Sequence, residues 1–458
     1  MRNPARLFAS ESLDPLRRSE LGLLLRDEGS AMFEGWSDAG AWTIVLPWPE
    51  EIRRAHWESI DECEKLLNQI TSEPLHESDP DAPLPPFLGG WIGFVSYDAG
   101  AAAHGVAIYE KHPPEPPAWF ARHERGIAID STGRSFLFCA PDRREETREA
   151  LKSALRETAK VRQPVDVRPG ASRSPLRQSL DASEYEKAVD SIREAIRRGD
   201  LYQVNLTRSF STEGPVDPVD LYLAIIGEAP PRCSAYINGG SWQIASASPE
   251  VFLRYDARLG VAESRPIKGT IERTGDDETD SRVLRSSEKD ASEHLMIVDL
   301  IRNDFGRVAP PGMVEVASFR DVLTLRHVLH LESTVRASGL QGRPFGEVFT
   351  SMFPSGSITG APKRAVVRFI RELEPVPRGV YTGAIGYWDS RGISEWSVAI
   401  RTAVVAGDHA RYHAGGGVVW DSEPEAEERE SIAKARAFLD YCHRRAGATP
   451  SSGSLSPR

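Results

Sequence analysis

The chain has 458 residues, of which 40% are hydrophobic and 27% charged, and its formal net charge is −11. Acidic and basic residues are mixed, and no basic stripe with interleaved aromatic residues is present, which disfavours a nucleic-acid partner. No apolar run approaches the roughly 20 residues that a membrane-spanning helix needs, and the N-terminus has no apolar signal core. The four cysteines form no CxxC pair, so we expect a cytoplasmic protein without disulfides, zinc or a membrane segment.

Residues 1–150 are predicted to form an N-terminal region, followed by a Pro/Arg/Ser-rich linker at 163–179. Glycine and aromatic residues in GGWIGFVSYD are typical of a buried strand with close backbone approach. The expected elements are strands at Ala41–Pro47, Gly89–Asp98 and Gly126–Ile129, and a charged helix at Arg143–Val161.

Residues 180–445 form the second predicted region, and the polar 446–458 is a predicted disordered tail. Ser183 and Glu186 have the spacing of a capping box, and Gly199 is expected to end the helix that they begin. In LYQVNLTRSF, polar and apolar residues alternate, which predicts a strand. Its polar face either meets water, the commoner case, or lines a pocket.

Further elements in this region mix helices with antiparallel-looking strands, which indicates the α+β class rather than a doubly wound sheet. The expected helices are Lys289–Phe305 and Pro424–His443, and the expected strands are Gly383–Trp388, Glu395–Val405 and Tyr412–Val419.

Two of these helices carry acidic pairs at a spacing that places both carboxylates on one face: Asp290 with Glu293, and Glu427 with Glu430. Taken alone, each pair is more typical of a solvated surface. If both pairs face one interior, two charges at 4 Å repel by about 4 kcal/mol at an effective dielectric constant of 20. A cation would relieve that repulsion, and Mg²⁺ suits carboxylate oxygens completed by substrate oxygens and water.

Two further residues are placed for chemistry. Lys268 lies between Ile267 and Gly269, and a lysine in such a tight, poorly solvated position is freed as a nucleophile or base. Glu250 follows a Ser-Pro turn, and a partly buried glutamate can act as a general acid. Considered alone, Lys268 would more often be a surface lysine near a turn. The surrounding sequence therefore has to distinguish a reactive lysine from a surface one.

Read together, the motifs resemble the chorismate-utilising enzyme family, which includes anthranilate, aminodeoxychorismate, isochorismate and salicylate synthases. The matching stretches cover most of residues 180–445 in consistent order, and residues 1–150 are similar to the family's more variable N-terminal region. The stretches are YQVNLT, SASPE, SRPIKGT, KDASEHLMIVDLIRNDFGRV, HVLHLEST, FPSGSITGAPK, YTGAIGYW, SVAIRTA and AGGGVVWDSEPEAEERES.

The resemblance implies a large two-sheet α/β sandwich of the anthranilate synthase component I type, with central helices around one site. It places Glu293 and Glu430 at magnesium-ligand positions, assisted by Asp290 and Glu427. It places Lys268 and Glu250 at the reacting centre. The implied substrate contacts are Gln203, Gly269, Thr270, His330, Ser357, Thr359, Tyr381, Arg401, Gly415, Gly416, Gly417 and Lys434.

Two positions discriminate among the family's activities. Isochorismate and salicylate synthases carry a lysine where Gln203 stands, so hydroxylation is disfavoured here. Anthranilate synthases usually carry alanine where Lys268 stands, whereas aminodeoxychorismate synthases carry PIKGT, as this chain does. The resemblance therefore implies conversion of chorismate and ammonia to 4-amino-4-deoxychorismate, for p-aminobenzoate and folate synthesis, through a covalent Lys268 adduct.

Two alternatives stay open: anthranilate synthase component I, and a non-catalytic chorismate-binding regulatory subunit. Some relatives bind tryptophan through two stretches that correspond here to GLLLRDEGSAMFEGW and APPRCSAY. Arg232 and Cys233 replace the small apolar clamp in the second stretch, which disfavours tryptophan binding. No cysteine lies in a Gly-x-Cys-x-Gly turn, so we expect a separate glutaminase subunit to supply the ammonia.

Overall fold

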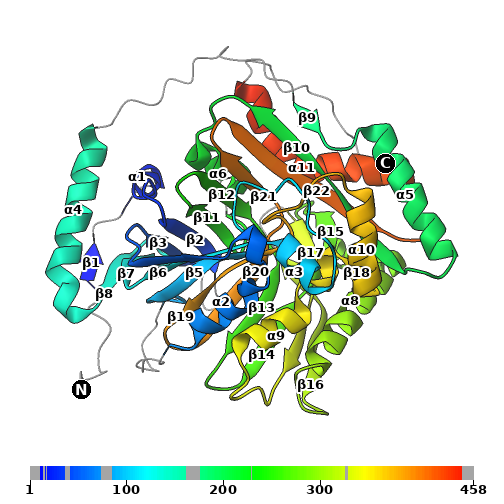
Figure 1. Ribbon diagram of the computed structural model, residues 1–458, viewed down its shortest axis with the longest axis horizontal. Helices are drawn as coiled ribbons and strands as arrows, with labels where there is room; N and C mark the ends of the chain where they lie inside the picture. The colour runs from blue at the N-terminus through cyan, green and yellow to red at the C-terminus, as the bar shows by residue number, and fades with distance from the viewer. Residues whose placement is uncertain are drawn as a thin grey trace.

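The computed structural model describes residues 11–13, 16, 18–36, 42–73, 85–160, 176–227, 230–324 and 328–445. Its described strands form two large antiparallel sheets flanked by helices (Figure 1). The predicted α+β class and two-sheet sandwich are confirmed.

The first sheet, sheet A, has 12 strands within the described residues. In spatial order they are β1 (Glu11–Leu13), β8 (Ser135–Cys139), β7 (Arg125–Ile129), β3 (Trp42–Leu46), β2 (Ala31–Trp36), β11 (Ser234–Asn238), β12 (Trp242–Ala247), β21 (Thr402–Ala406), β22 (His409–Val418), β10 (Gln203–Glu213) and β18 (Gly360–Ala361), with β9 (Arg177–Gln178) also pairing β10.

The second sheet, sheet B, has 10 strands in the part of the chain that the structure describes. Their order is β15 (Ile267–Glu272), β17 (Val328–Ala337), β14 (Val261–Arg265), β13 (Val251–Asp256), β20 (Ile393–Val398), β19 (Ala384–Asp389), β5 (Gly90–Val95), β6 (Ala118–His123) and β4 (Glu51–Arg54), with β16 (Val314–Thr324) pairing β17.

Apolar side chains of both sheets interdigitate in one buried cluster, in which Phe33 and Ile44 of sheet A meet Phe94 and Tyr387 of sheet B. This packing is the physical basis of the sandwich, because each sheet has to bury an apolar face. A second cluster joins the outer face of sheet A to α1 (Arg18–Leu23), α4 (Arg144–Lys160), α6 (Pro218–Ile226) and α11 (Pro424–Arg445).

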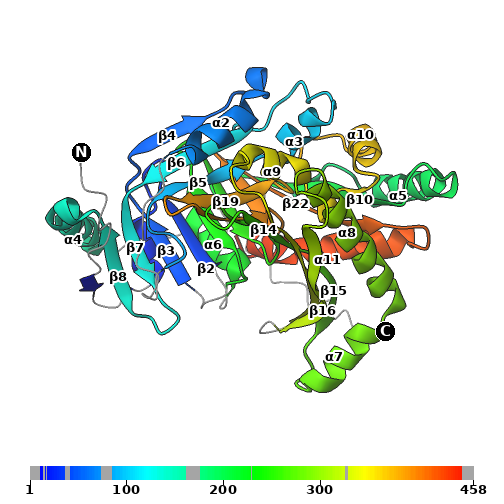
Figure 2. The same cartoon turned by 90° about the horizontal axis from the view of Figure 1, so that it is seen from below.

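The third large cluster gathers sheet B, part of sheet A and the remaining apolar helices. Those helices are α2 (Glu62–Thr71), α3 (Tyr97–Ala103), α5 (Ala182–Arg197), α8 (Glu288–Gly306), α9 (Phe345–Met352) and α10 (Lys363–Leu373). Helix α7 (Asp277–Ser286) extends to one side of the sandwich with β16 (Figure 2).

Strands of residues 1–150 and of residues 180–445 share both sheets, since β2 pairs with β11 in sheet A and β5 pairs with β19 in sheet B. Of the predicted linker, residues 163–175 lie outside the described residues, while Arg177–Gln178 form β9. The predicted tail, 446–458, also lies outside them.

Three local predictions need correction. The strand expected to reach Asp98 ends at Val95, and Ser96 then caps α3 by accepting a hydrogen bond from the Ala99 N–H. The capping box of α5 is formed by Asp181 and Glu184, whereas Ser183 lies inside the helix. The physical reason is that Asp181 has the extended backbone that an N-cap residue needs.

The strand expected at Glu395–Val405 is in fact two strands, β20 and β21, which belong to different sheets. The chain crosses between the sheets at Ala399–Arg401, where Arg401 adopts a left-handed backbone with φ of 50°. Such a conformation is uncommon for a residue other than glycine and marks a locally constrained position. The crossing brings Arg401 to the boundary of the two sheets.

All four cysteines are free thiols, as predicted. Within the described ranges, no helix combines the length and the apolar composition that crossing a bilayer requires.

Candidate active site

Lys268 lies on β15, opposite Leu331 of β17. The strand pairing is irregular at the next residue, Gly269, whose φ of 69° favours glycine. The side chain of Lys268 reaches β22 of sheet A: a β-carbon on Gly417 would lie 3.7 Å from Lys268 Nζ and would overlap the side-chain nitrogen of Gln203. Lys268 is half-buried, and among the described residues no carboxylate forms an ion pair with its ammonium.

Glu250 lies between β12 and β13 and is only 5% exposed. Burial raises the pKa of its carboxyl from the usual 4.5 to about 7, although a hydrogen bond with Ser357 and the charge of Lys268 both oppose that rise. The two side chains therefore lie near enough for the charge of Lys268 to act on the Glu250 carboxyl. A glutamate with this pKa can hold a proton at neutral pH and release it to a leaving group.

Three consecutive glycines of β22, Gly415 to Gly417, lie between the Lys268 side chain and the acidic residues of α11. Successive strand residues face opposite sides of a sheet. Gly417 faces Lys268 and Gln203, whereas a β-carbon on Gly416 would lie 2.9 Å from Glu427 Oε2 and 3.5 Å from Glu430 Oε1. Only backbone therefore separates the α11 acids from the inner face of the sheet.

The acids of α11 differ in their surroundings. Glu427 is buried, and its Oε1 accepts a hydrogen bond of 2.7 Å from the Ser422 hydroxyl. Glu430 is about half exposed and forms a 2.6 Å ion pair with Lys434. Lys434 also donates a 3.0 Å hydrogen bond to the Gly415 carbonyl oxygen, which ties the helix to the glycine-rich strand.

The second acidic pair lies on α8. Asp290 packs against Gly269, because a β-carbon there would lie 3.4 Å from its Cγ, and Glu293 is half-buried one turn further along the helix. Within the described part of the chain, no three His, Cys, Asp or Glu side chains are close enough together to hold one metal ion. The two acidic pairs lie on different helices, α8 and α11. One or two carboxylates are enough for Mg²⁺ when substrate oxygens and water complete the octahedron, so the donor set still fits that ion.

Three predicted substrate contacts surround the crossing between the sheets. Tyr381 is buried and stacks on His413, with ring centroids 5.2 Å apart. His330 Nδ1 lies 3.2 Å from the Gly269 carbonyl oxygen. Burial lowers the pKa of His330 and the nearby charge of Arg401 lowers it further, so the imidazole is neutral at pH 7.

The remaining predicted contacts have defined surroundings, except for Thr270. Its backbone pairs with His330, and its side chain lies outside the described residues. The Ser357 hydroxyl lies 3.0 Å from the Ser355 hydroxyl, in the 3-10 turn Gly356–Ile358. Thr359 donates its hydroxyl to the Ser355 carbonyl oxygen and is fully buried, so its side chain holds the turn in shape. Gln203 is buried too, and its Oε1 accepts no hydrogen bond from the described residues.

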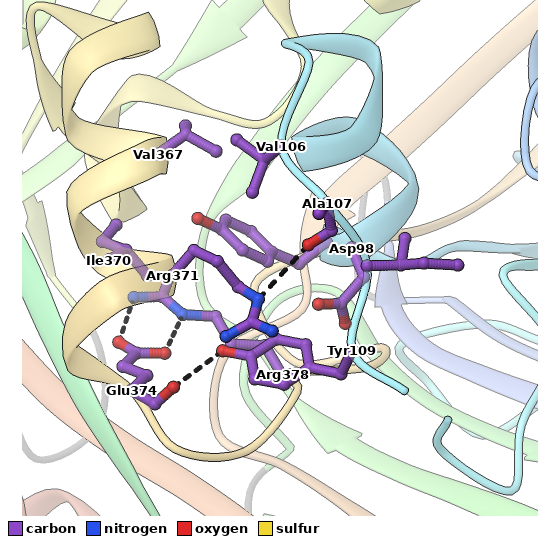
Figure 3. A pocket seen from close by; sticks show the side chains of 11 residues that line it. Asp98, Val106, Ala107, Tyr109, Val367, Ile370, Arg371, Glu374 and Arg378 are labelled. Carbon is purple, nitrogen blue, oxygen red and sulfur yellow. Dashed lines mark hydrogen bonds and ion pairs between the residues drawn. The ribbon is translucent and has the colours of Figure 1, made fainter. Parts of the chain in front are cut away.

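A buried ion pair between Glu374 and Arg378 escaped the sequence analysis. The two side chains are 3% and 1% exposed and lie 2.6 Å apart, beside a cavity of about 10 Å³ (Figure 3). Arg378 also donates to the carbonyl oxygens of Asn205 and Ile358, while Glu374 accepts from Thr207. The pair therefore joins β10 to the turn that carries Ser357. Opposite charges four residues apart in ELEPVPRG were the available signal, but the intervening prolines disfavour a helix and hide the pairing.

Replacement of Glu374 by alanine should destabilise the protein by about 3–5 kcal/mol, because Arg378 would remain buried without its carboxylate. The free energy of unfolding, measured by urea denaturation, tests this expectation. The exposed neighbour Glu372 supplies the matched control, since its alanine variant should stay within about 0.5 kcal/mol of the parent. Equal stability of the two variants would contradict a structural role for the pair.

Comparison with known proteins identifies the family to which this fold and site belong. A family model described as chorismate binding enzyme matches residues 33–440, and the chain belongs to that family. The chain is 35% identical to anthranilate synthase component 1 of Streptomyces coelicolor, over 82% of this chain and 77% of that protein. It is 36% identical to aminodeoxychorismate synthase of Streptomyces pristinaespiralis, over 85% of this chain and 56% of that longer protein.

Solved structures agree with this assignment. Anthranilate synthase component I of Streptococcus pneumoniae superimposes with a TM-score of 0.68 at 27% identity, covering 95% of this chain and 93% of the other. The menaquinone-specific isochorismate synthase of Escherichia coli has a TM-score of 0.68 at 18% identity, covering 96% of this chain and 94% of the other, and shares the fold. The curated relatives named above thus carry two different names, anthranilate synthase component 1 and aminodeoxychorismate synthase.

Proposed function

We propose that this protein is the synthase component that converts chorismate and ammonia to 4-amino-4-deoxychorismate, the precursor of p-aminobenzoate. The observation that carries the proposal is the position of Lys268 Nζ beside Gly417 and Gln203, within electrostatic reach of the buried Glu250. An anthranilate synthase needs open space for ammonia at this place, whereas here an amine of the chain itself occupies it.

In the proposed reaction, the uncharged amine of Lys268 adds to C2 of the chorismate ring while the C4 hydroxyl leaves. Glu250 donates the proton with which that hydroxyl departs as water. Both ring double bonds move by one position in this step, and the Lys268 nitrogen gives up a proton that returns to Glu250. Ammonia then adds at C4, the two double bonds shift back, and the Lys268 amine leaves C2 with a proton from the new C4 nitrogen. The chain is regenerated, and the net change is replacement of the C4 hydroxyl by an amino group.

We propose Mg²⁺ as the bound ion, held by Glu293 and Glu430 with Asp290 and Glu427 as supporting acids. When bound, the ion would supply charge neutralisation for the ring carboxylate and polarise the ring. Arg401 and Tyr381 would hold the other carboxylate. Lys434, which already lies against Glu430, would share that acid's charge.

Removal of magnesium with a chelator should abolish turnover, and added Mg²⁺ should restore it. A Glu430→Gln variant should need at least about tenfold more Mg²⁺ for half-maximal rate, since even residues that only support a ligand cost ten- to a hundredfold in metal affinity. Glu425→Gln, on the same helix but 79% exposed, is the control and should titrate as the parent does. Identical magnesium curves for both variants would remove Glu430 from the metal site.

A separate glutaminase subunit is the proposed source of ammonia. The chain's four cysteines include none in the turn that such an enzyme uses for its nucleophile. The product of the proposed reaction would be aminodeoxychorismate, from which a lyase removes pyruvate.

Anthranilate synthesis is the second candidate, because several similar relatives carry that name. The deciding experiment incubates the purified chain with chorismate, Mg²⁺ and ammonium, then adds purified aminodeoxychorismate lyase. Formation of p-aminobenzoate only after the lyase is added supports the proposal. Fluorescent anthranilate formed without the lyase would overturn it, and a lack of any product would favour the non-catalytic regulatory subunit.

A further inference from the structure

A hollow of about 500 Å³ lies where the C-terminal ends of α3 and α8 meet the N-terminal end of α10. Helices α3 and α10 lie side by side in both views (Figures 1 and 2). None of its lining residues belongs to the candidate active site. The lining residues are Ala103, His104, Gly105, Asp304, Arg307, Lys363 and Arg364.

The charge of the hollow is positive. Arg307, Lys363 and Arg364 face it, and the one lining carboxylate, Asp304, is already engaged by Lys363 at 2.5 Å. Burial lowers the pKa of His104, and the three cations lower it further, so the imidazole adds no charge at neutral pH. In a chain of net charge −11, this is a local reversal of sign that attracts anions. Guanidinium groups favour oxyanions because they can bind two oxygens at once.

The same side chains hold one segment of backbone. Arg307 donates to the Ser351 carbonyl oxygen at 3.2 Å, and Lys363 donates to the Met352 carbonyl oxygen at 2.7 Å. In addition, His104 Nε2 lies 3.3 Å from the Phe353 carbonyl oxygen. The side chains that line the hollow therefore contact three consecutive backbone carbonyls, those of residues 351–353.

That segment leads directly into the active site. Ser355 and Ser357 follow it within four residues, and the Ser357 hydroxyl is hydrogen-bonded to Glu250. An oxyanion between the guanidinium groups would compete with the Ser351 carbonyl for Arg307. The carbonyl would lose a donor, and the turn that carries Ser357 would shift relative to Glu250.

We propose that this hollow is an oxyanion site for a small dianion of the phosphate or dicarboxylate type, held mainly by Arg307 and Arg364. Its occupation is transmitted to the reacting centre through the carbonyls of residues 351–353 and the Ser357 turn. The binding step is independent of the proposed function, whereas the effect on turnover rests on it.

The test titrates the full-length protein, without Mg²⁺, with inorganic phosphate and separately with malonate. Chloride keeps the ionic strength constant, and binding is followed by calorimetry and by the thermal midpoint. The matched variants are Arg364→Gln, an exposed position of the hollow, and Arg302→Gln, an exposed position of α8 that does not line the hollow and pairs with Asp299. We expect one saturable site in the parent and in Arg302→Gln, and an affinity about tenfold lower in Arg364→Gln.

Binding that does not saturate, or that is equal in both variants, would overturn the site. The relative response to phosphate and malonate identifies which oxyanion chemistry fits better. Turnover of chorismate at saturating anion should change in the parent but not in Arg364→Gln at the same concentration. Saturable binding with unchanged turnover would overturn the coupling. Binding that persists in a protein found to make anthranilate would contradict only the proposed function.

Discussion

A Lys268→Met variant should lose aminodeoxychorismate formation by a factor on the order of 10³ or more, because removing a covalent nucleophile leaves only binding and the remaining polar groups. Methionine keeps most of the length and the apolar stem of lysine. Since Lys268 is half-buried and forms no ion pair with described residues, its replacement breaks no ion pair in the described part of the chain. The thermal midpoint should therefore change little while the rate falls.

The rate is measured with chorismate, ammonium and Mg²⁺ in the coupled lyase assay, with Lys187→Met as the control. Lys187 is exposed on α5, and its variant should keep the parental rate. Acid-quenched parent enzyme, incubated with chorismate and no ammonium, should gain the mass of chorismate less one water, and the Lys268→Met protein should not. Full activity in the variant, or the same adduct on it, would remove the covalent role.

Local sequence patterns predict many of the strands and helices of the fold. Alternation in β10 predicted a strand, and the structure shows that its polar face is buried, with Gln203 and Thr207 each 1% exposed. Alternation alone cannot say which sheet a residue joins, so the run Glu395–Val405 was predicted as one strand. The chain passes from β20 of sheet B to β21 of sheet A at Ala399–Arg401. This crossing depends on how the two sheets pack, which the local sequence pattern does not show.

For the candidate site, the predictable part comprises residues within long motifs, such as Lys268 and the glycines of β22. What the sequence could not show depends on contacts between distant segments. Glu374 and Arg378 derive their importance from Asn205 and Ile358, far away in the chain. The basic hollow likewise combines residues 103–105, 304–307 and 363–364, and no single segment contains enough of its charge to indicate a site.

Replacement of Glu250 by glutamine should lower turnover by about 10²–10⁴-fold, the usual contribution of a general acid. In the parent, the carboxyl must be protonated, so the rate should fall as pH rises through about 7, the pKa that burial gives Glu250. Glutamine cannot donate that proton, and the variant's small residual rate should lack this decline. A parental rate in the variant at pH 6 would exclude the acid role.

The same substitution should change stability in the opposite direction to activity. Because the folded-state pKa of Glu250 is raised from 4.5 to about 7, the folded protein binds this proton more tightly than the unfolded chain does. The stabilising contribution is complete below pH 4.5 and is lost as pH rises to 7, by up to about 3 kcal/mol. Above pH 7 a charged carboxylate stays buried in the parent, whereas a neutral amide fills the same space in Glu250→Gln.

At pH 8, therefore, the Glu250→Gln variant should be more stable than the parent, and the difference should shrink as pH falls towards 5. Urea denaturation across pH 5–8 measures it. Asp98, whose pKa burial also raises to about 7, is present in both proteins, so its contribution cancels in the comparison. A parental stability curve that stays parallel to the variant's curve would show that Glu250 titrates normally. The buried carboxyl would then be too weakly basic to hold the proton that the departing hydroxyl requires.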